Sequence, residues 1–186
     1  MPEEDGPSYY ILAAVQVHPL DLEGMREEAE DVVGGSFWHT TEEIRTERGR
    51  ERAHEFLTVL GTGAEPCIVA LASRVRADDV DAEAARRDCF RTLLPALQNG
   101  GPGWSPTRLA VLEQRRTRAM RNRDAATHKL LVSDGTISRH FQLLQASPAD
   151  EHLLWLPDLV ASAVRRDHAH RDRSYVEHIK HNLTIL

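Results

Sequence analysis

The stretch LLWLPDLVASAVRR, residues Leu153–Arg166, places a single carboxylate in the first turn of an otherwise apolar helix. Pro157 suits the first position of a helix, because a missing N–H costs nothing there. Apolar residues then recur at helical spacing, at Leu156, Leu159, Val160, Ala163 and Val164. The pattern predicts a helix with Asp158 at its N-terminus, beside the face that packs on the core.

Asp158 has two interpretations at this position. A carboxylate at a helix N-terminus complements the helix dipole, an effect of roughly 0.3–1 kcal/mol on any surface helix. Considered by itself, the residue pattern favours this structural role. The alternative is a functional role, in which the acid contributes to a site next to a sheet.

Two further segments, Tyr9–Val15 (YYILAAV) and the spaced apolar residues of 175–185, accompany this helix. Together the three segments resemble a group of uncharacterised proteins from high-GC bacteria, which are similar to the family called domain of unknown function 3800. The resemblance follows the element order over most of the chain. It implies a ribonuclease-H-like α/β fold, with a central mixed sheet flanked by helices.

Composition sets broad limits on the chain. Its 186 residues, 41% hydrophobic and 28% charged, fit a single globular domain over 1–186. No apolar run approaches the roughly 20 residues that span a bilayer, and 1–8 lack the features of a signal peptide. We therefore expect a cytoplasmic protein with no membrane contact, with 1–8 disordered. Cys67 and Cys89 both fall in apolar segments and are expected to be reduced core thiols.

The net charge of −6 argues against broad electrostatic binding to nucleic acid. The distribution of charge is less unfavourable to nucleic-acid binding than the net charge is, because arginines gather in two runs. These are Arg115, Arg116, Arg118, Arg121 and Arg123, and then Arg165, Arg166, Arg171 and Arg173. Arg115, Arg116 and Arg165 are candidates for contact with phosphate, although such runs more commonly form a solvated face.

Strand-like and helix-like segments alternate along the chain. The predicted strands are 9–17, 66–75, 107–113 and 137–144, with 36–40 a short strand or extended segment. The predicted helices are 19–33, 46–60, 80–98, 117–133, the Asp158 helix and a terminal helix from about Ser174, with an exposed joint at 167–173. This alternation indicates an α/β domain.

In open α/β sheets, functional groups collect at the carboxyl ends of strands. Glu113 closes the strand 107–113, so its side chain is a candidate for such a crevice, and Asp158 approaches from a helix start. A solvated ion pair between Glu113 and the following arginines is the structural alternative. Asp124 is a weaker candidate, which we expect on the solvent side of its helix.

A third acid comes from the segment FWHTTEE, residues 37–43, which resembles a short histidine-containing motif of the same group. The resemblance implies that His39 orients water or a phosphate and that Glu42 binds metal. The structural alternative is an ordinary helix start, with threonines followed by acids at the positive end of the dipole.

The chain departs from the family pattern at its start. Relatives begin with an apolar strand ending in an Asp-Glu-Ser-like motif, whose first aspartate is a central metal ligand. Only eight residues precede Tyr9, and they contain no such strand. Either the start is truncated, or this branch has lost the first edge strand and with it the activity. A missing strand leaves an exposed sheet edge, which a homodimer would cover.

Two functions follow from these observations. The first is a metal-dependent nuclease-like enzyme acting on phosphodiester bonds, with Asp158, Glu113 and Glu42 as ligands of Mg²⁺ or Mn²⁺ and with His39 assisting. Carboxylate oxygens are the ligands that Mg²⁺ requires. The alternative is a non-catalytic ribonuclease-H-like module that binds protein or nucleic acid. Ten histidines invite a metal site of another kind, but no cysteine or paired-carboxylate motif completes one.

Overall fold

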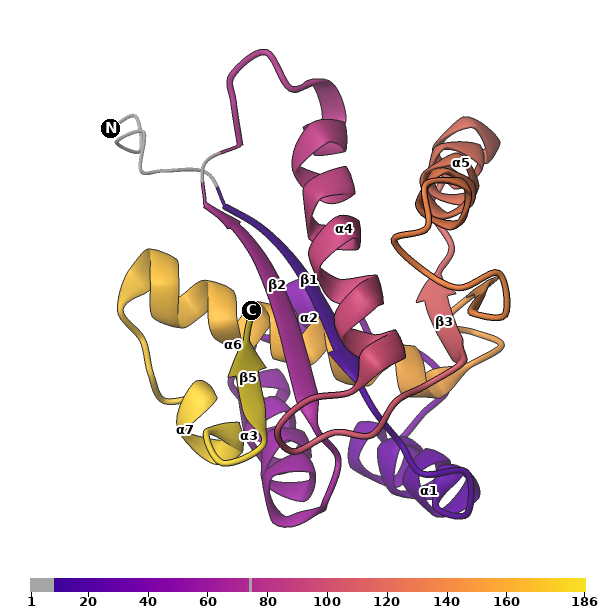
Figure 1. The fold of residues 1–186 in the computed structure, drawn as a ribbon. Helices are drawn as coiled ribbons and strands as arrows, with labels where there is room; N and C mark the ends of the chain where they lie inside the picture. The colour runs from indigo at the N-terminus through magenta and orange to yellow at the C-terminus, as the bar shows by residue number, and fades with distance from the viewer. Residues whose placement is uncertain (1–8, 74) are drawn as a thin grey trace.

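The computed structural model describes residues 9–73 and 75–186. Its elements form a mixed α/β arrangement in which helices flank small sheets, as the sequence predicts (Figure 1). The prediction of disorder for 1–8 falls outside the described residues.

A three-stranded mixed sheet occupies the centre of the structure. It contains β1 (Tyr9–Val15), β2 (Cys67–Ser73) and β5 (Leu183–Ile185), in the order β1-β2-β5. β1 and β2 are antiparallel, with Tyr9 opposite Ser73 and Val15 opposite Cys67, whereas β5 runs parallel to β2. β1 therefore forms one edge of this sheet.

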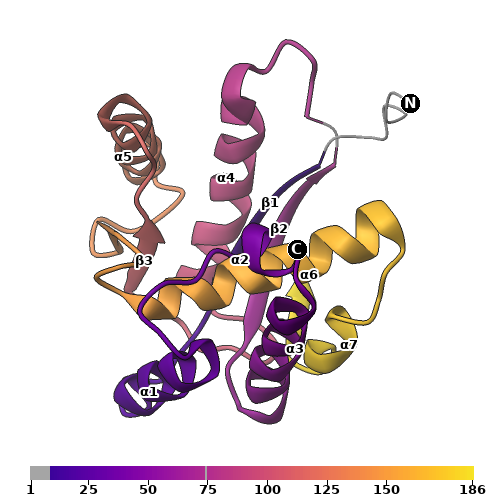
Figure 2. The ribbon, with the colours of Figure 1, turned by 180° about the vertical axis from the view of Figure 1, so that it is seen from behind.

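Helices cover both faces of the central sheet. One face carries α4 (Glu83–Asn99), and the other carries α6 (Trp155–His170) and α3 (Glu47–Thr62) (Figures 1 and 2). Successive side chains of a strand point to opposite faces. Accordingly, Ile11 and Ala13 pack in the core beneath α6, while Tyr10 and Leu12 pack in the core beneath α4. This explains why the strands of this sheet are apolar at nearly every position.

A second, separate sheet contains two parallel strands, β3 (Leu109–Glu113) and β4 (Gln142–Ala146), which α5 (Arg118–Ser133) connects. The single central sheet expected from the sequence is thus divided in two. β1 and β3 are the strands at the facing edges, so each has an edge that pairs with no other described strand.

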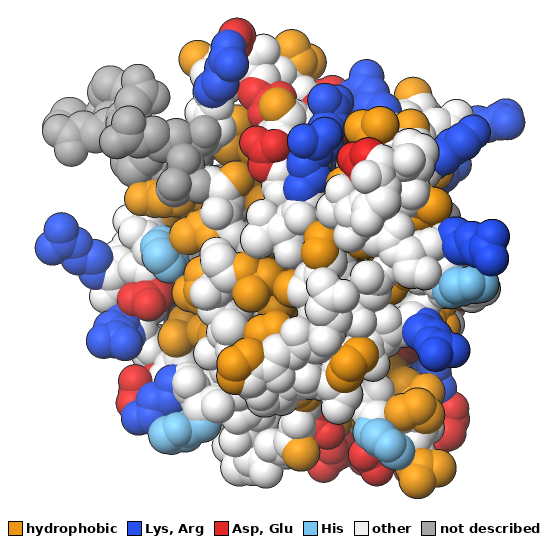
Figure 3. Space-filling model, viewed as in Figure 1, with side chains coloured by type: hydrophobic (Ala, Val, Ile, Leu, Met, Phe, Trp, Pro, Cys, Tyr) orange, Lys and Arg blue, Asp and Glu red, His pale blue; other side chains and the backbone are white. Residues whose placement is uncertain are grey.

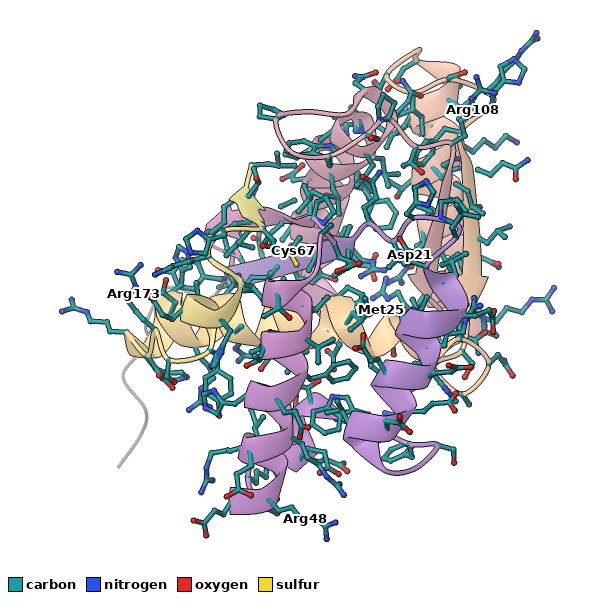
Figure 4. All side chains as sticks on the ribbon, turned by 90° about the horizontal axis from the view of Figure 1, so that it is seen from below. Asp21, Met25, Arg48, Cys67, Arg108 and Arg173 are labelled. Atoms are coloured by element: carbon teal, nitrogen blue, oxygen red, sulfur yellow. The ribbon has the colours of Figure 1, made fainter. Side chains whose placement is uncertain are left out.

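Shorter helices complete the layer on the α6 side. α1 (Leu22–Val33) and α2 (Thr40–Glu43) precede α3, and the 3₁₀ turns η1 (Val80–Ala82) and η2 (His152–Leu154) lead into α4 and α6. Seen from below, Met25 and Cys67 lie inside the structure, whereas Arg48, Arg108 and Arg173 extend into solvent (Figure 4).

One predicted strand is wrong in position, and one short segment takes the second of its two predicted forms. The segment 36–40, predicted as a short strand or extended segment, forms no strand; His39 is extended, and the buried Trp38 donates a hydrogen bond from its indole Nε1 to Thr40 Oγ1 at 2.8 Å. In the segment 137–144, Ile137 and Phe141 are both buried and anchor a turn, so the strand begins only at Gln142. In both segments, large apolar side chains hold irregular backbone against the core.

The C-terminal region also differs from the prediction. α6 continues to His170, through much of the expected joint, and the terminal helix is reduced to α7 (Val176–Ile179). The chain then forms β5, a strand that the sequence analysis missed. α7 packs tightly on α3, since a Cβ added to Gly61 would lie 1.8 Å from the carbonyl oxygen of His178. This contact directs the chain toward the free edge of β2.

Both cysteines are buried and unpaired, as predicted for core thiols. Burial, together with the nearby charge of Glu65, raises the pKa of the Cys67 thiol to about 12. Among the described residues, no helix combines the length and the apolar character that crossing a bilayer requires.

The prediction that Asp124 faces solvent is wrong. Asp124 is 2% exposed and accepts two hydrogen bonds from Arg86, at 2.7 Å from Nε and 2.9 Å from Nη2. Arg86 also donates to the hydroxyl of Tyr10 at 2.6 Å. Burial opposes the charge of Arg86, but the hydrogen bonds that it donates to Asp124 and Tyr10 outweigh this effect and raise the pKa of the guanidinium above its ordinary value. These contacts join α4, α5 and β1.

We expect Asp124→Ala to lower the free energy of unfolding by about 3–5 kcal/mol, because it leaves the Arg86 guanidinium buried without its partner. Urea unfolding followed by circular dichroism measures this change. Asp78→Ala is the control, since Asp78 forms an exposed ion pair with Arg76 whose loss costs at most about 1 kcal/mol. Equal effects of the two substitutions would contradict the structural importance of the buried pair.

Candidate functional site

A cavity of about 450 Å³ lies between β1, the end of β3 and the start of α6. Its polar lining comes from Tyr10, Arg86, Glu113, Gln114, Arg115, Arg116 and Asp158. Apolar residues of β1 and the side chains of Val111, Leu112, Met120, Leu154, Pro157 and Ala161 complete the wall. The two carboxylates that the sequence analysis ranked highest thus line the same cavity.

Asp158 lies in the first turn of α6, as predicted. The helix begins at Trp155, because the 3₁₀ turn η2 leads directly into it, so Pro157 is its third residue and not its first. The buried face of α6 includes Leu156, Leu159 and Val160, whereas Asp158 is exposed on the side that borders the cavity. Burial of the neighbouring residues therefore fixes the direction of this carboxylate.

Glu113 is the last residue of β3 and enters the same cavity. Loss of solvation raises the pKa of its carboxyl group, and the negative charge of Asp158 raises it further. The charges of His39 and Arg86 act in the opposite direction on this pKa. Since Glu113 and Asp158 line one cavity and the charge of Asp158 disfavours the ionised form of Glu113, a cation between them would be favoured.

The two candidate residues of the FWHTTEE segment, His39 and Glu42, lie in different surroundings. His39 precedes α2 and lies near enough to Glu113 to lower the pKa of that residue, although it does not line the cavity. Glu42 is exposed on α2 and is also absent from the cavity lining. The burial of Trp38 and Thr40 sets the orientation of this short helix.

Sequence reasoning missed Arg86 and Tyr10. Arg86 borders the cavity while its guanidinium is held by Asp124 and Tyr10 and lies 5.2 Å from the centre of the Phe90 ring. A signal was present in the sequence, because Arg86 shares helical spacing with the core residues Phe90, Leu93 and Leu97. A charged residue on the apolar face of a helix predicts a buried partner.

The three candidate phosphate-binding arginines occupy different environments. Arg115 is half-buried, with Nη1 2.6 Å from Glu83 and 3.7 Å from Asp124, so it is part of the structural network. Arg116 is exposed at the cavity, and no ion pair involves it among the described residues. Arg165 is exposed on α6, two turns beyond Asp158 and on about the same side of the helix, roughly 10 Å along its axis.

Basic side chains do not gather in one patch on the face shown in Figure 3, where they lie mainly around the rim. Apolar side chains are exposed across the middle of that face. This face therefore offers no broad basic surface of the kind that binds nucleic acid through many phosphate contacts.

The cavity offers a limited set of possible metal ligands. Within residues 9–73 and 75–186, no group of three or more His, Cys, Asp or Glu side chains is arranged to hold a metal ion. Glu113 and Asp158 supply two carboxylates of the hard oxygen type that Mg²⁺ prefers, and Mg²⁺ commonly binds through one or two carboxylates together with substrate phosphates. The donor chemistry fits one hard cation.

Comparison of the chain with models of protein families, with curated proteins and with solved structures finds no match.

We expect Asp158→Asn to lower the pKa of Glu113 toward its ordinary value, because the substitution removes the neighbouring negative charge. The elevation caused by burial remains. Carbon-detected NMR titration of the glutamate carboxyl groups measures this pKa. Asp31→Asn, on the exposed side of α1, is the control and should leave it unchanged. An unchanged pKa in Asp158→Asn would show that the two carboxylates do not interact.

The raised pKa of Glu113 also predicts a pH dependence of stability. The folded state holds the Glu113 proton more tightly than the unfolded chain, so stability falls as the pH rises from the ordinary value of 4.5 through the folded-state pKa. Glu113→Gln should remove this loss and flatten the dependence of the unfolding free energy on pH. A variant as pH-dependent as the wild type over this window would contradict the assignment.

Proposed function

We propose that this chain is a divalent-metal-dependent, nuclease-like enzyme that acts on phosphodiester bonds, with a ribonuclease-H-like arrangement of its elements. The observation that carries the proposal is the meeting of Glu113, at the end of a strand, with Asp158, at the start of a helix, in one cavity. Repulsion between the two carboxylates is relieved when they share a cation.

Glu113 and Asp158 are the residues that would hold Mg²⁺ or Mn²⁺. When bound, such an ion supplies Lewis-acid stabilisation of the negative charge on a phosphodiester. His39, which influences the pKa of Glu113 from outside the cavity lining, would orient a water molecule or a phosphate. Glu42 has a weaker claim as a ligand, because it does not line the cavity.

In this proposal, Arg116 and Arg165 bind the phosphate groups of the substrate. Arg116, exposed at the cavity, would bind the phosphate next to the cleaved bond. Arg165 would bind a phosphate farther along the strand, since the roughly 10 Å between it and Asp158 along α6 spans more than one nucleotide. Arg115 has a structural role through Glu83 and Asp124 and orients the segment that carries Arg116.

A second candidate function is a non-catalytic module that binds protein or nucleic acid. The observation that favours it is the pair of facing strand edges on β1 and β3, which leave backbone groups available to a partner.

Calorimetric titration with Mn²⁺ and Mg²⁺ tests the proposed enzyme. We expect one site per chain, with Asp158→Asn and Glu113→Gln each weakening binding by at least about tenfold. Glu42→Gln should bind like the wild type, and Asp31→Asn is the matched control for loss of an exposed acid. Absence of binding to the wild-type protein would exclude the metal-dependent enzyme and leave the binding module.

Binding to a single-stranded oligonucleotide at several salt concentrations tests the arginines. Arg116→Ala and Arg165→Ala should each weaken binding and reduce the slope of log K against log salt by about 0.7, the value for one phosphate contact on a single strand. Arg48→Ala, exposed at the far end of α3 (Figure 4), is the control. Equal effects of all three substitutions would indicate non-specific attraction and no defined phosphate path.

A further inference from the structure

The edge of β1 presents unpaired backbone groups at alternate residues. In an antiparallel pair, residues alternately bond to the partner strand or point away from it. The hydrogen bond from Gln16 N to Pro66 O, at 2.9 Å, fixes this alternation for the β1–β2 ladder. The N–H and C=O groups of Ile11, Ala13 and Val15 therefore point away from β2, and no backbone bond to another described segment involves them.

The edge of β3 presents the same pattern. Hydrogen bonds from Gln142 N to Arg108 O, at 2.7 Å, and from Gln114 N to Ala146 O, at 2.8 Å, frame the parallel β3–β4 ladder. The even-numbered residues of β3 therefore bond to β4. The backbone groups of Leu109, Val111 and Glu113 point away from β4, toward β1, although the carbonyl oxygen of Leu109 accepts a hydrogen bond from Thr107 Oγ1 at 3.2 Å.

A trough lies between these two edges. A cavity of about 400 Å³ is lined by 12–17 on the β1 side and by 107 and 109–112 on the β3 side. It adjoins the cavity of the candidate site, and the two share Leu12, Ala13, Val111, Leu112, Leu154 and Pro157. Apolar residues of α4 cover one side of the trough, and residues of η2 and α6 cover the other. A strand in the trough would thus be covered on both faces, as the central strand of a sheet is.

The amide of Gln16 closes one end of the trough. It donates to Ser105 O at 2.7 Å and accepts from Ser105 N at 2.9 Å, so it joins the end of β1 to the segment that precedes β3. β1 and β3 therefore run in opposite directions. A strand placed between them would run antiparallel to one of them and parallel to the other.

The charges of the trough define the chemistry of this strand. In the 400 Å³ cavity the charged lining residues are Arg26 and Glu151, which bond to each other at 2.6 Å and so neutralise one another. The walls thus favour an uncharged, apolar segment. Residues 1–8 do not meet this requirement, because they contain two prolines and three acidic residues.

We propose that the trough between β1 and β3 accepts an uncharged apolar β-strand from a partner polypeptide, which hydrogen-bonds to both edges at once. This is strand addition, in which main-chain bonds give affinity and side-chain pockets give specificity. One end of the inserted strand would lie beside Glu113 and Asp158, so the partner would form one wall of the candidate site. The inference does not depend on the proposed metal-dependent activity.

The test uses the full chain and the synthetic peptide acetyl-Thr-Val-Ala-Val-Ala-Val-Thr-amide. Amide hydrogen exchange followed by NMR measures which N–H groups the peptide protects. Saturable binding should slow the exchange of Ala13 and Val111 at least about tenfold, while Ala14 and Leu112, already bonded within their ladders, change little. Absence of binding at millimolar peptide, or protection confined to other segments, would overturn the proposal.

Proline substitutions distinguish the edge of β1 that faces the trough from the edge that pairs with β2. Ala13→Pro removes an N–H that faces the trough and leaves the β1–β2 ladder intact, so it should keep the fold and weaken peptide binding at least about tenfold. Ala14→Pro is the matched control, because it removes a ladder donor and should lower the melting temperature. Unchanged peptide affinity in a folded Ala13→Pro protein would overturn the proposal.

Two further measurements keep the test independent of the folding of the proline variant. A peptide N-methylated at alternate residues lacks the donors for one edge and should bind the wild-type protein more weakly; equal binding would overturn strand addition. Sedimentation of the protein without peptide tests a second copy as the occupant. A dimer that already protects Ala13 would replace the proposed partner with another copy of this chain.

Discussion

The buried ion pair between Arg86 and Asp124 is the interaction on which the rest of the structure depends. The two residues lie on different helices, α4 and α5, and Arg86 also holds the hydroxyl of Tyr10 on β1. Charges taken out of water are tolerated only when they are paired and fully hydrogen-bonded. This polar contact, together with the apolar cluster that contains Phe90, Leu131 and Phe141, holds the second sheet against the central one, so that Glu113 and Asp158 line one cavity.

Much of the fold was predictable because its strands and helices carry clear periodicity. β1 and β2 are apolar at nearly every position since both faces are covered, and α3, α4 and α6 have continuous apolar stripes. The errors occurred where tertiary contacts decide the local structure. Phe141 anchors a turn instead of a strand, and β5 is a strand only because the tight contact at Gly61 brings it to β2.

The candidate site was predictable to a similar extent and for a similar reason. Glu113 and Asp158 were identified because the ends of strands and the starts of helices converge in α/β proteins. The direction of α2 depends on the burial of Trp38, which the sequence alone does not specify, and so Glu42 could not be placed. The partner of Arg86 likewise lies 38 residues away on another helix.

The side-chain clamp between Gln16 and Ser105 has a mechanical consequence. It joins the two sheets at one end, the Arg86 network joins them at the other, and strand edges along the intervening length carry no bonds to one another. The unit of β3, β4 and α5 is also held by the hydrogen bond from Thr107 N to Leu97 O at 2.9 Å, and Leu131 and Phe141 share one apolar cluster with Phe90 of α4. The spacing between β1 and β3 is thus fixed at both ends and from beneath, so a ligand enters an opening whose width is set before it arrives.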